Sequence, residues 1–151
     1  MISRALTTTP LLAVLATGLA ACGGGSGSSS GDASAAILTT LRAHYVNLAD
    51  AKLDAACNDQ TVGFQNAFAR SFDTNSCPAA MQTYRRHLTA LGSWTKAALR
   101  NVDVTGLKVT GATATATVHL SDPAGGAGIP MGQVRLVRAG GQWMISNVLA
   151  D

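Results

Sequence analysis

Three cysteines, Cys22, Cys57 and Cys77, are the residues of this 151-residue chain whose possible chemistry is limited most sharply by their spacing. A thiol can ligate a metal, exchange electrons in a redox pair, form a structural disulfide or carry a covalent modification. The three thiols form no Cys-x-x-Cys pair and no Cys/His cluster at zinc spacing. The sequence therefore predicts no metal site and no cofactor, and it leaves a structural bond and a covalent modification to consider.

Cys22 stands at the end of a segment built like an export signal. Residues 1–4 give a short positive start, residues 10–21 an apolar run, and residues 19–22 read Leu-Ala-Ala-Cys. The apolar run is shorter than the roughly 20 residues of a membrane-spanning helix. The segment resembles a bacterial lipoprotein signal peptide. This resemblance implies that residues 1–21 are removed and that the Cys22 sulfur takes a diacylglycerol; the alternative is a plain secreted protein with an incidental cysteine.

The residues after Cys22 predict a tether followed by one folded domain. Residues 23–31 read GGGSGSSSG and offer no side chain for a core. Such a segment behaves as a flexible coil with a span of about 15 to 18 Å. We therefore expect residues 22–31 to be a lipidated tether and residues 32–151 to be the domain, held by lipid at the extracytoplasmic face of the cell membrane.

Once Cys22 is assigned to lipid, Cys57 and Cys77 remain as a pair in an exported, oxidising setting. We predict a disulfide between them. It closes a loop of about 20 residues, which the chain-entropy account values at roughly 3 kcal/mol.

The charge pattern argues against nucleic acid as a partner. The net charge is +3, and loss of Arg4 with the leader brings the mature chain closer to neutral. Nucleic-acid modules gather Lys and Arg on one face, whereas the single adjacent basic pair here is Arg85-Arg86. Because 47% of residues are apolar, a wholly disordered chain is also excluded.

Three helices are predicted before any strand. Apolar residues at steps of three and four predict a helix over residues 34–56. Asp59 is the expected cap of a second helix, which carries Phe64, Phe68 and Phe72. A third helix has Pro78 in its first turn and stops at Gly92.

After residue 94 the apolar period changes from about 3.6 to 2, which indicates strands. Residues 112–120 alternate Ala, Val or Leu with Thr or His, and residues 99–109 are expected to pair with them, with a bulge at Gly106. A longer loop over residues 122–132 precedes a hairpin. Its strands are residues 133–139 and 142–149, joined by Gly140-Gly141. Helices followed by an antiparallel meander predict an α+β two-layer domain.

The end of this meander carries a family resemblance. Residues 140–145 read Gly-Gly-Gln-Trp-Met-Ile, which resembles the last strand of the nuclear transport factor 2-like superfamily, and in particular its small exported lipoproteins (SnoaL-like, cystatin-like fold). The resemblance covers residues 32–151. It implies three N-terminal helices packed on a curved antiparallel sheet of about four strands, which together form a cone around an apolar cavity.

Enzymes of this superfamily that move protons need an acid or base inside the cavity, whereas many members bind without catalysis. The candidates in this chain are His44, Asp50, Asp54, Asp73, Asp103 and His119. We interpret Asp50 and Asp54 as solvated residues four apart on one helical face, His44 as a satisfied or exposed side chain, and His119 as a residue on the Thr side of its strand. The sequence holds no Ser-His-Asp set, phosphate loop or carboxylate cluster.

Aromatic residues are the candidates for contacting a ligand. Tyr45, Phe64, Phe68 and Trp94 are the residues that we assign to a possible binding site. For Phe64 and Phe68 we favour packing on the sheet over lining a cavity, and we expect Trp143 to be core.

We therefore expect a membrane-anchored, non-catalytic binding or assembly module rather than an enzyme. Its partner would be a small apolar ligand or an envelope protein. The alternative is an isomerase or hydratase of the polyketide-cyclase type.

Overall fold

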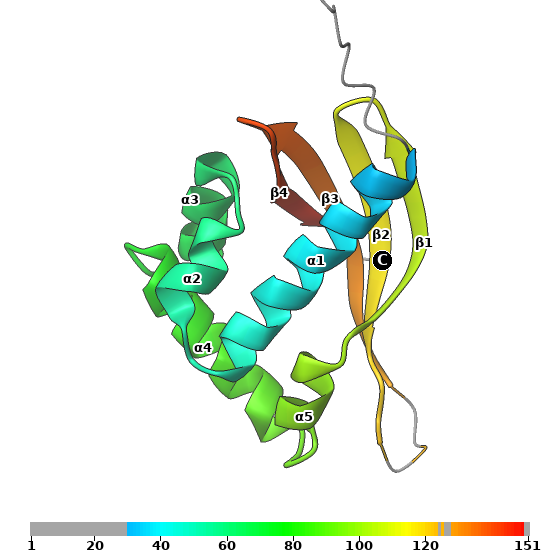
Figure 1. Ribbon diagram of the computed structural model, residues 1–151. Helices are drawn as coiled ribbons and strands as arrows, with labels where there is room; N and C mark the ends of the chain where they lie inside the picture. The colour runs from blue at the N-terminus through cyan, green and yellow to red at the C-terminus, as the bar shows by residue number, and fades with distance from the viewer. Residues whose placement is uncertain (1–29, 124, 126–127, 150–151) are drawn as a thin grey trace, which may run out of the picture.

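The computed structural model describes residues 30–123, 125 and 128–149, and within them the chain is α+β (Figure 1). The five helices are α1 (Ser30–Ala49), α2 (Leu53–Asn58), α3 (Val62–Ser71), α4 (Cys77–Ala90) and α5 (Thr95–Arg100). The four strands are β1 (Asp103–Thr110), β2 (Thr113–Leu120), β3 (Ile129–Ala139) and β4 (Gln142–Leu149). Cys22, the signal segment and most of the predicted tether lie outside the described residues. Ser30 and Gly31, assigned above to the tether, belong to α1.

The predicted helix over residues 34–56 is in fact two helices. Ala51 adopts a left-handed conformation with φ 59°, and the N–H groups of Ala51 and Lys52 donate to the carbonyls of Leu48 (3.2 Å) and Asn47 (2.9 Å). This pair of bonds is the Schellman pattern that ends a helix, with Ala in the place that Gly usually takes. Since α1 ends before residue 50, Asp50 and Asp54 do not share a helical face, which corrects that expectation. Asp50 instead pairs with Arg100, whose Nε lies 3.1 Å from Oδ1.

The N-terminal cap of α3 differs from the expected one, whereas the start of α4 agrees with expectation. Thr61, rather than Asp59, caps α3, because its hydroxyl accepts from the Phe64 N–H at 3.3 Å. α4 begins as predicted, with Pro78 in its first turn behind the Ser76 cap.

The start of the predicted first strand is wrong. Leu99 lies in α5, and the first strand begins at Asp103. Because Leu99 is fully buried, its apolar character reflects packing of a short helix rather than a strand.

The sheet is antiparallel in the order β1-β2-β3-β4. The register of β1 on β2 shifts between Thr105 and Lys108, and Gly106 has φ 60°, so the predicted bulge is confirmed. Gly140 and Gly141 form the β3–β4 turn with φ of 57° and 83°, values that only Gly adopts without strain. β3 starts at Ile129, so the end of the predicted loop over residues 122–132 is strand.

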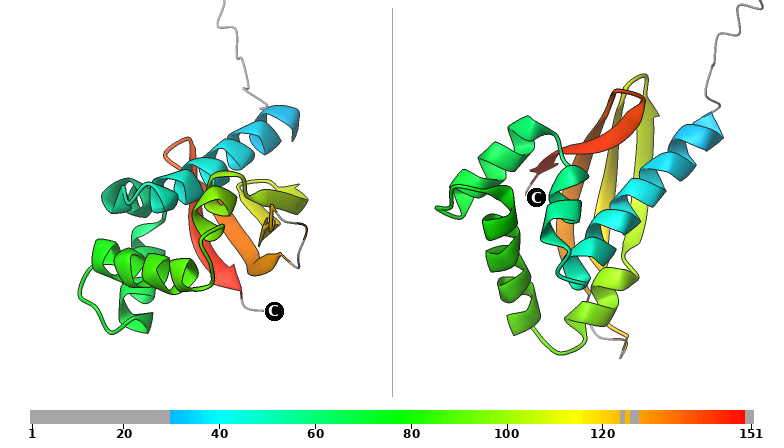
Figure 2. Two further views of the ribbon diagram at one scale, coloured as in Figure 1. Left: turned by 90° about the horizontal axis from the view of Figure 1, so that it is seen from below. Right: turned by 60° about the vertical axis from the view of Figure 1, so that its left-hand side comes forward.

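The helices bury one face of the sheet. In β2 the alternate residues Ala114, Ala116, Val118 and Leu120 are buried, and they share one core with Ile37, Leu41 and Leu48 of α1 and with Trp143 and Ile145 of β4. Figures 1 and 2 show α1 lying across the sheet, with α3 and α4 standing to one side. Trp143 is 6% exposed and is core, as predicted.

One link fastens the α2–α4 region to the sheet, and another closes the region on itself. The connection between α2 and α3 bridges to β4, because the Thr61 N–H donates to the Ile145 carbonyl and the Ile145 N–H donates to the Asp59 carbonyl, each at 2.8 Å. A disulfide joins Cys57 of α2 to Cys77 of α4, with Cα atoms 6.1 Å apart. The backbone bridge therefore holds the α2–α3 connection against β4, and the disulfide holds α4 to α2.

Candidate functional site

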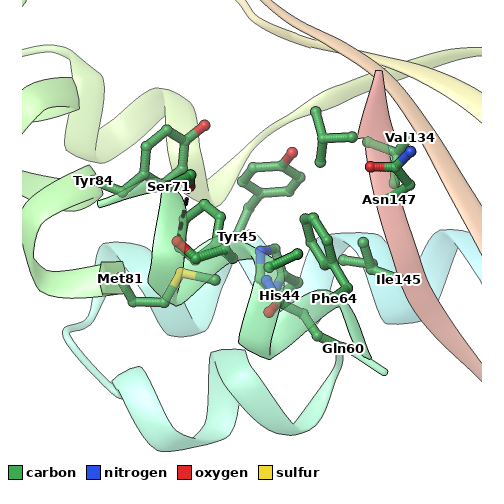
Figure 3. A pocket seen from close by; sticks show the side chains of 13 residues that line it. His44, Tyr45, Gln60, Phe64, Ser71, Met81, Tyr84, Val134, Ile145 and Asn147 are labelled. Carbon is green, nitrogen blue, oxygen red and sulfur yellow. Dashed lines mark hydrogen bonds between the residues drawn. The ribbon is translucent and has the colours of Figure 1, made fainter. Parts of the chain in front are cut away.

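A cavity of about 330 Å³ lies between the helices and the last two strands (Figure 3). That volume is at the small end of the range for pockets that bind small molecules. Its walls come from α1, α3, α4, β3 and β4 and from the α2–α3 connection. The lining residues are His44, Tyr45, Gln60, Phe64, Ala67, Phe68, Ser71, Met81, Tyr84, Val134, Ile145, Asn147 and Val148.

One face of α3 forms an aromatic wall of this cavity. Phe64, Ala67, Phe68 and Ser71 follow one another at the three- and four-residue steps that place side chains on one helical face. The ring centroid of Phe68 lies 5.9 Å from that of Phe64 and 5.7 Å from that of Tyr84. Phe64 and Phe68 are half-buried at the margin of the core. Both rings therefore pack against the core and also line the cavity, so each of the two alternatives left open by the sequence describes part of their surroundings.

The opposite wall contains a buried histidine. His44 of α1 is 5% exposed, and its Nδ1 lies 2.9 Å from the carbonyl oxygen of Ala56. Burial lowers the pKa of His44 to about 4, although the Ala56 carbonyl acts in the opposite direction. The imidazole is therefore neutral at physiological pH. Of the two expectations for His44, this placement agrees with a satisfied side chain, because Nδ1 has a carbonyl partner, and excludes an exposed one.

Two further polar side chains are buried beside the histidine. Tyr45 is 4% and Gln60 is 1% exposed, and both line the cavity. Among the described residues, the Tyr45 hydroxyl and the Gln60 amide nitrogen have no hydrogen-bond partner. Burial raises the pKa of Tyr45, and it raises the pKa of Tyr84 to about 12, so both phenols are protonated donors.

The cavity wall is uncharged. The lining residues include no Asp, Lys or Arg. The nearest acid to the histidine is Asp59, whose Oδ2 lies 3.9 Å from His44 Nδ1. Burial raises the pKa of Asp59. The arrangement therefore offers apolar surface together with a few neutral hydrogen-bonding groups.

Not every residue assigned from the sequence reaches this cavity. Tyr45, Phe64 and Phe68 line it, whereas Trp94 does not: Trp94 precedes α5, and a Cβ on Gly92 would lie 2.7 Å from its Nε1. Trp94 therefore packs on its own turn, which corrects its assignment to the site. The other candidate acids and bases, Asp50, Asp54, Asp73, Asp103 and His119, are also absent from the lining.

Gln60 is the buried polar residue of the site that sequence reasoning missed, along with several lining residues of α3, α4, β3 and β4. It precedes the Thr61 cap, in a connection that carries no strand or helix pattern of its own. Its side chain is buried because the backbone bridge to Ile145 presses this connection against β4. The spacing of Phe64, Ala67, Phe68 and Ser71, in contrast, was a usable signal in the sequence.

Among the described residues, no group of three or more His, Cys, Asp or Glu is placed to hold a metal ion. Nor does any helix described here have the length and apolar character needed to cross a bilayer. Comparison of the chain with protein-family models, with curated proteins and with solved structures gave no match.

Proposed function

We propose that this protein is a membrane-anchored extracytoplasmic lipoprotein whose domain binds a small, mainly apolar ligand without catalysis. The cavity carries this proposal, because aromatic and aliphatic side chains from five elements surround a space of about 330 Å³. Pockets of this type, with a few placed polar groups, are the usual sites for small molecules. An envelope protein is a weaker candidate as the partner, because the feature that supports binding is a cavity rather than a flat surface.

The family assignment is part of the same proposal. Five helices and a four-stranded antiparallel sheet, with the cavity beside the last two strands, are compatible with a nuclear transport factor 2-like cone. The Gly-Gly-x-Trp-x-Ile ending forms the β3–β4 turn and the start of β4. Fold alone does not specify an activity, so the support for binding comes from the side chains of the cavity.

The lipid anchor is proposed from the sequence around Cys22. Two or three acyl chains hold a protein to a bilayer far more firmly than one. The Gly/Ser segment that follows would keep the cavity within a short distance of the membrane, where apolar ligands concentrate.

Native mass spectrometry of protein extracted from its own membrane tests ligand binding directly. We expect the wild-type protein to retain a non-covalent small molecule. Ala67→Trp, at the exposed rim of the cavity, should lose that mass, whereas Asn66→Trp on the outer face of α3 should keep it. A mass equal to that of the lipidated polypeptide alone, in both wild type and control, would count against binding.

The isomerase or hydratase reading keeps one supporting observation, the buried His44 beside Tyr45. The lowered pKa of His44 argues against catalysis by this residue. Because that pKa lies about 3 units below neutrality, protonating the imidazole at neutral pH costs about 4 kcal/mol. Exchange of the α-protons of 2-tetralone in deuterium oxide, followed by NMR, distinguishes a binding protein from a proton-transfer enzyme. We expect no difference between wild type and His44→Asn; a His44-dependent acceleration would favour the enzyme.

A further inference from the structure

The buried polar groups of the cavity restrict what its ligand is. A polar atom that is taken out of water without a hydrogen bond is costly. His44, Tyr45 and Gln60 are each more than nine-tenths buried, and they line the same cavity from α1 and the α2–α3 connection (Figure 3). Their unpartnered polar atoms remain open to the cavity, because Arg85 Nε is the one fully enclosed side-chain nitrogen or oxygen without a partner among the described residues. A ligand that covers these groups must therefore replace their water with hydrogen bonds of its own.

The bond between His44 and Ala56 fixes the tautomer of the imidazole. A neutral imidazole carries one N–H and one lone pair. Because a carbonyl oxygen only accepts, the nitrogen 2.9 Å from the Ala56 oxygen must be the one that donates, and that nitrogen is Nδ1. Nε2, on the opposite edge of the ring, therefore holds the lone pair. Among the described residues Nε2 has no donor, so the cavity presents it as an acceptor.

The other two groups supply donors. The Tyr45 phenol is an O–H donor without a partner among the described residues, and the Gln60 amide nitrogen is another. The wall carries no charge that could pair with an ionised ligand. Burying a carboxylate or an ammonium group there would therefore be strongly unfavourable.

We infer that the ligand is an uncharged molecule with an apolar body and a hydroxyl group, and that the hydroxyl donates to His44 Nε2 while oxygen atoms of the ligand accept from Tyr45 or Gln60. This inference rests on the proposed small-ligand function and narrows it to a chemical class. A simple hydrocarbon would leave three polar groups unpaired, and a fatty acid anion would bring an uncompensated charge.

Three naphthalene derivatives of one shape test the class. 2-Naphthol donates and accepts, 2-methoxynaphthalene only accepts, and 2-naphthoate is an anion at neutral pH. Calorimetric titration uses the full-length protein in detergent micelles, with protein-free micelles titrated in parallel to subtract partitioning. We expect 2-naphthol to bind about tenfold more tightly than 2-methoxynaphthalene, and 2-naphthoate to bind least.

Variants of His44 test whether Nε2 is responsible for the preference for 2-naphthol over 2-methoxynaphthalene. The shorter amide of His44→Asn can still donate to Ala56 but does not reach the position of Nε2, so the preference for naphthol should fall to about twofold or less. His44→Gln places an amide oxygen near that position and should restore part of the preference. His119→Asn makes the same change outside the cavity and should leave the wild-type preference intact.

The outcomes distinguish a failure of the hydroxyl assignment from a failure of the proposed small-ligand binding. Equal affinity for naphthol and its methyl ether in the wild-type protein, or tightest binding of naphthoate, overturns the hydroxyl assignment and leaves small-ligand binding in place. An unchanged preference in His44→Asn, with an unchanged melting temperature, also overturns it. Failure of all three probes overturns the assignment, and the native mass spectra then decide whether the binding function falls as well.

Discussion

The carboxylate of Asp59 and the imidazole of His44 are close neighbours that do not form an ion pair. Asp59 Oδ2 lies 3.9 Å from His44 Nδ1, whereas the Ala56 carbonyl takes that nitrogen at 2.9 Å. The pKa of Asp59 is raised and that of His44 is lowered, both mainly by burial. An ion pair would shift both pKa values in the opposite directions. The histidine is therefore kept neutral, and its neutrality has a measurable effect on stability.

The first prediction concerns acid destabilisation. The folded-state pKa of His44 is about 4 and the ordinary value is 6.5, so the unfolded chain binds an additional proton between these values. The free energy of unfolding therefore rises with pH across this window, by about 3 kcal/mol in total. The contribution of His44 is fully present above the window and is lost as the pH falls through it. Urea unfolding at a series of pH values measures the slope.

Two variants identify the residue responsible for that slope. His44→Asn should remove most of it and His119→Asn should retain it. Asp59 acts in the opposite sense, because its raised pKa lets the folded chain keep a proton above pH 3.8. The difference in slope between wild type and His44→Asn between pH 4 and 6.5 therefore reports the imidazole. A pH-independent stability in the wild-type protein over that range would show that His44 titrates normally.

The second prediction uses the turn after α1. Ala51 sits at φ 59° in a conformation that costs an L-residue about 1 to 2 kcal/mol and costs Gly little. Ala51→Gly should therefore stabilise the protein by roughly 0.5 to 1 kcal/mol, despite the greater freedom of Gly in the unfolded chain. Thermal unfolding checks the sign. Gly introduced at Ala55, inside α2, is the control and should destabilise.

The third prediction concerns the aromatic wall. Because Phe64 and Phe68 are half-buried and line the cavity, each truncation to Ala should cost about 1 to 2 kcal/mol, less than the 3 to 5 of a fully buried ring. Each should weaken 2-naphthol binding at least about tenfold. Phe72→Ala is the control, since Phe72 packs against Phe68 with ring centroids 4.9 Å apart but does not itself line the cavity. A large loss of stability with unchanged binding would return these rings to the core.

The fourth prediction concerns the bond between Cys57 and Cys77. In a Cys22→Ala background, a thiol reagent should label nothing in the unfolded, unreduced protein and two sites after reduction. Replacing both cysteines with Ala should lower the free energy of unfolding by roughly 3 kcal/mol. Two reactive thiols before reduction would show that the pair is open in the cell.

The fifth prediction concerns Cys22. Cys22→Ala should leave an unprocessed or soluble precursor, whereas the wild-type protein should sediment with membranes. Metabolic labelling with a palmitate analogue should mark the wild type and not the variant. Wild-type protein in the culture fluid with an unmodified Cys22 would contradict the anchor.

The sheet could be predicted from sequence because its signals are local. Alternation over β2 gives its buried face, Gly140-Gly141 gives its last turn, and Gly106 gives its bulge. Each depends on neighbours along one or two strands. The end of α1 could not be found in this way, because Ala51 gives no sign of a left-handed turn, and without that turn residues 34–56 read as one helix.

The sequence named His44 and Tyr45 as candidates, but for the same reason it gave no sign of Gln60 or of the contact that His44 makes. Ala56 reaches His44 only after the chain reverses at Ala51, and Gln60 is buried only because of its bridge to Ile145. These contacts join segments distant in the sequence, and no periodicity records them. The aromatic stripe of α3 could be found from the sequence alone, but its spacing did not distinguish cavity lining from packing on the sheet.

The bridge between the α2–α3 connection and β4 also limits strand pairing between neighbouring copies of the protein. An open strand edge is a template on which a second chain can add its own strand. At Ile145 the connection already occupies both the N–H and the carbonyl of β4. A lipid anchor would concentrate these domains in two dimensions, where such contacts are most frequent. The segment that brings Gln60 into the cavity thus also shields this stretch of the sheet from neighbouring copies on a crowded membrane.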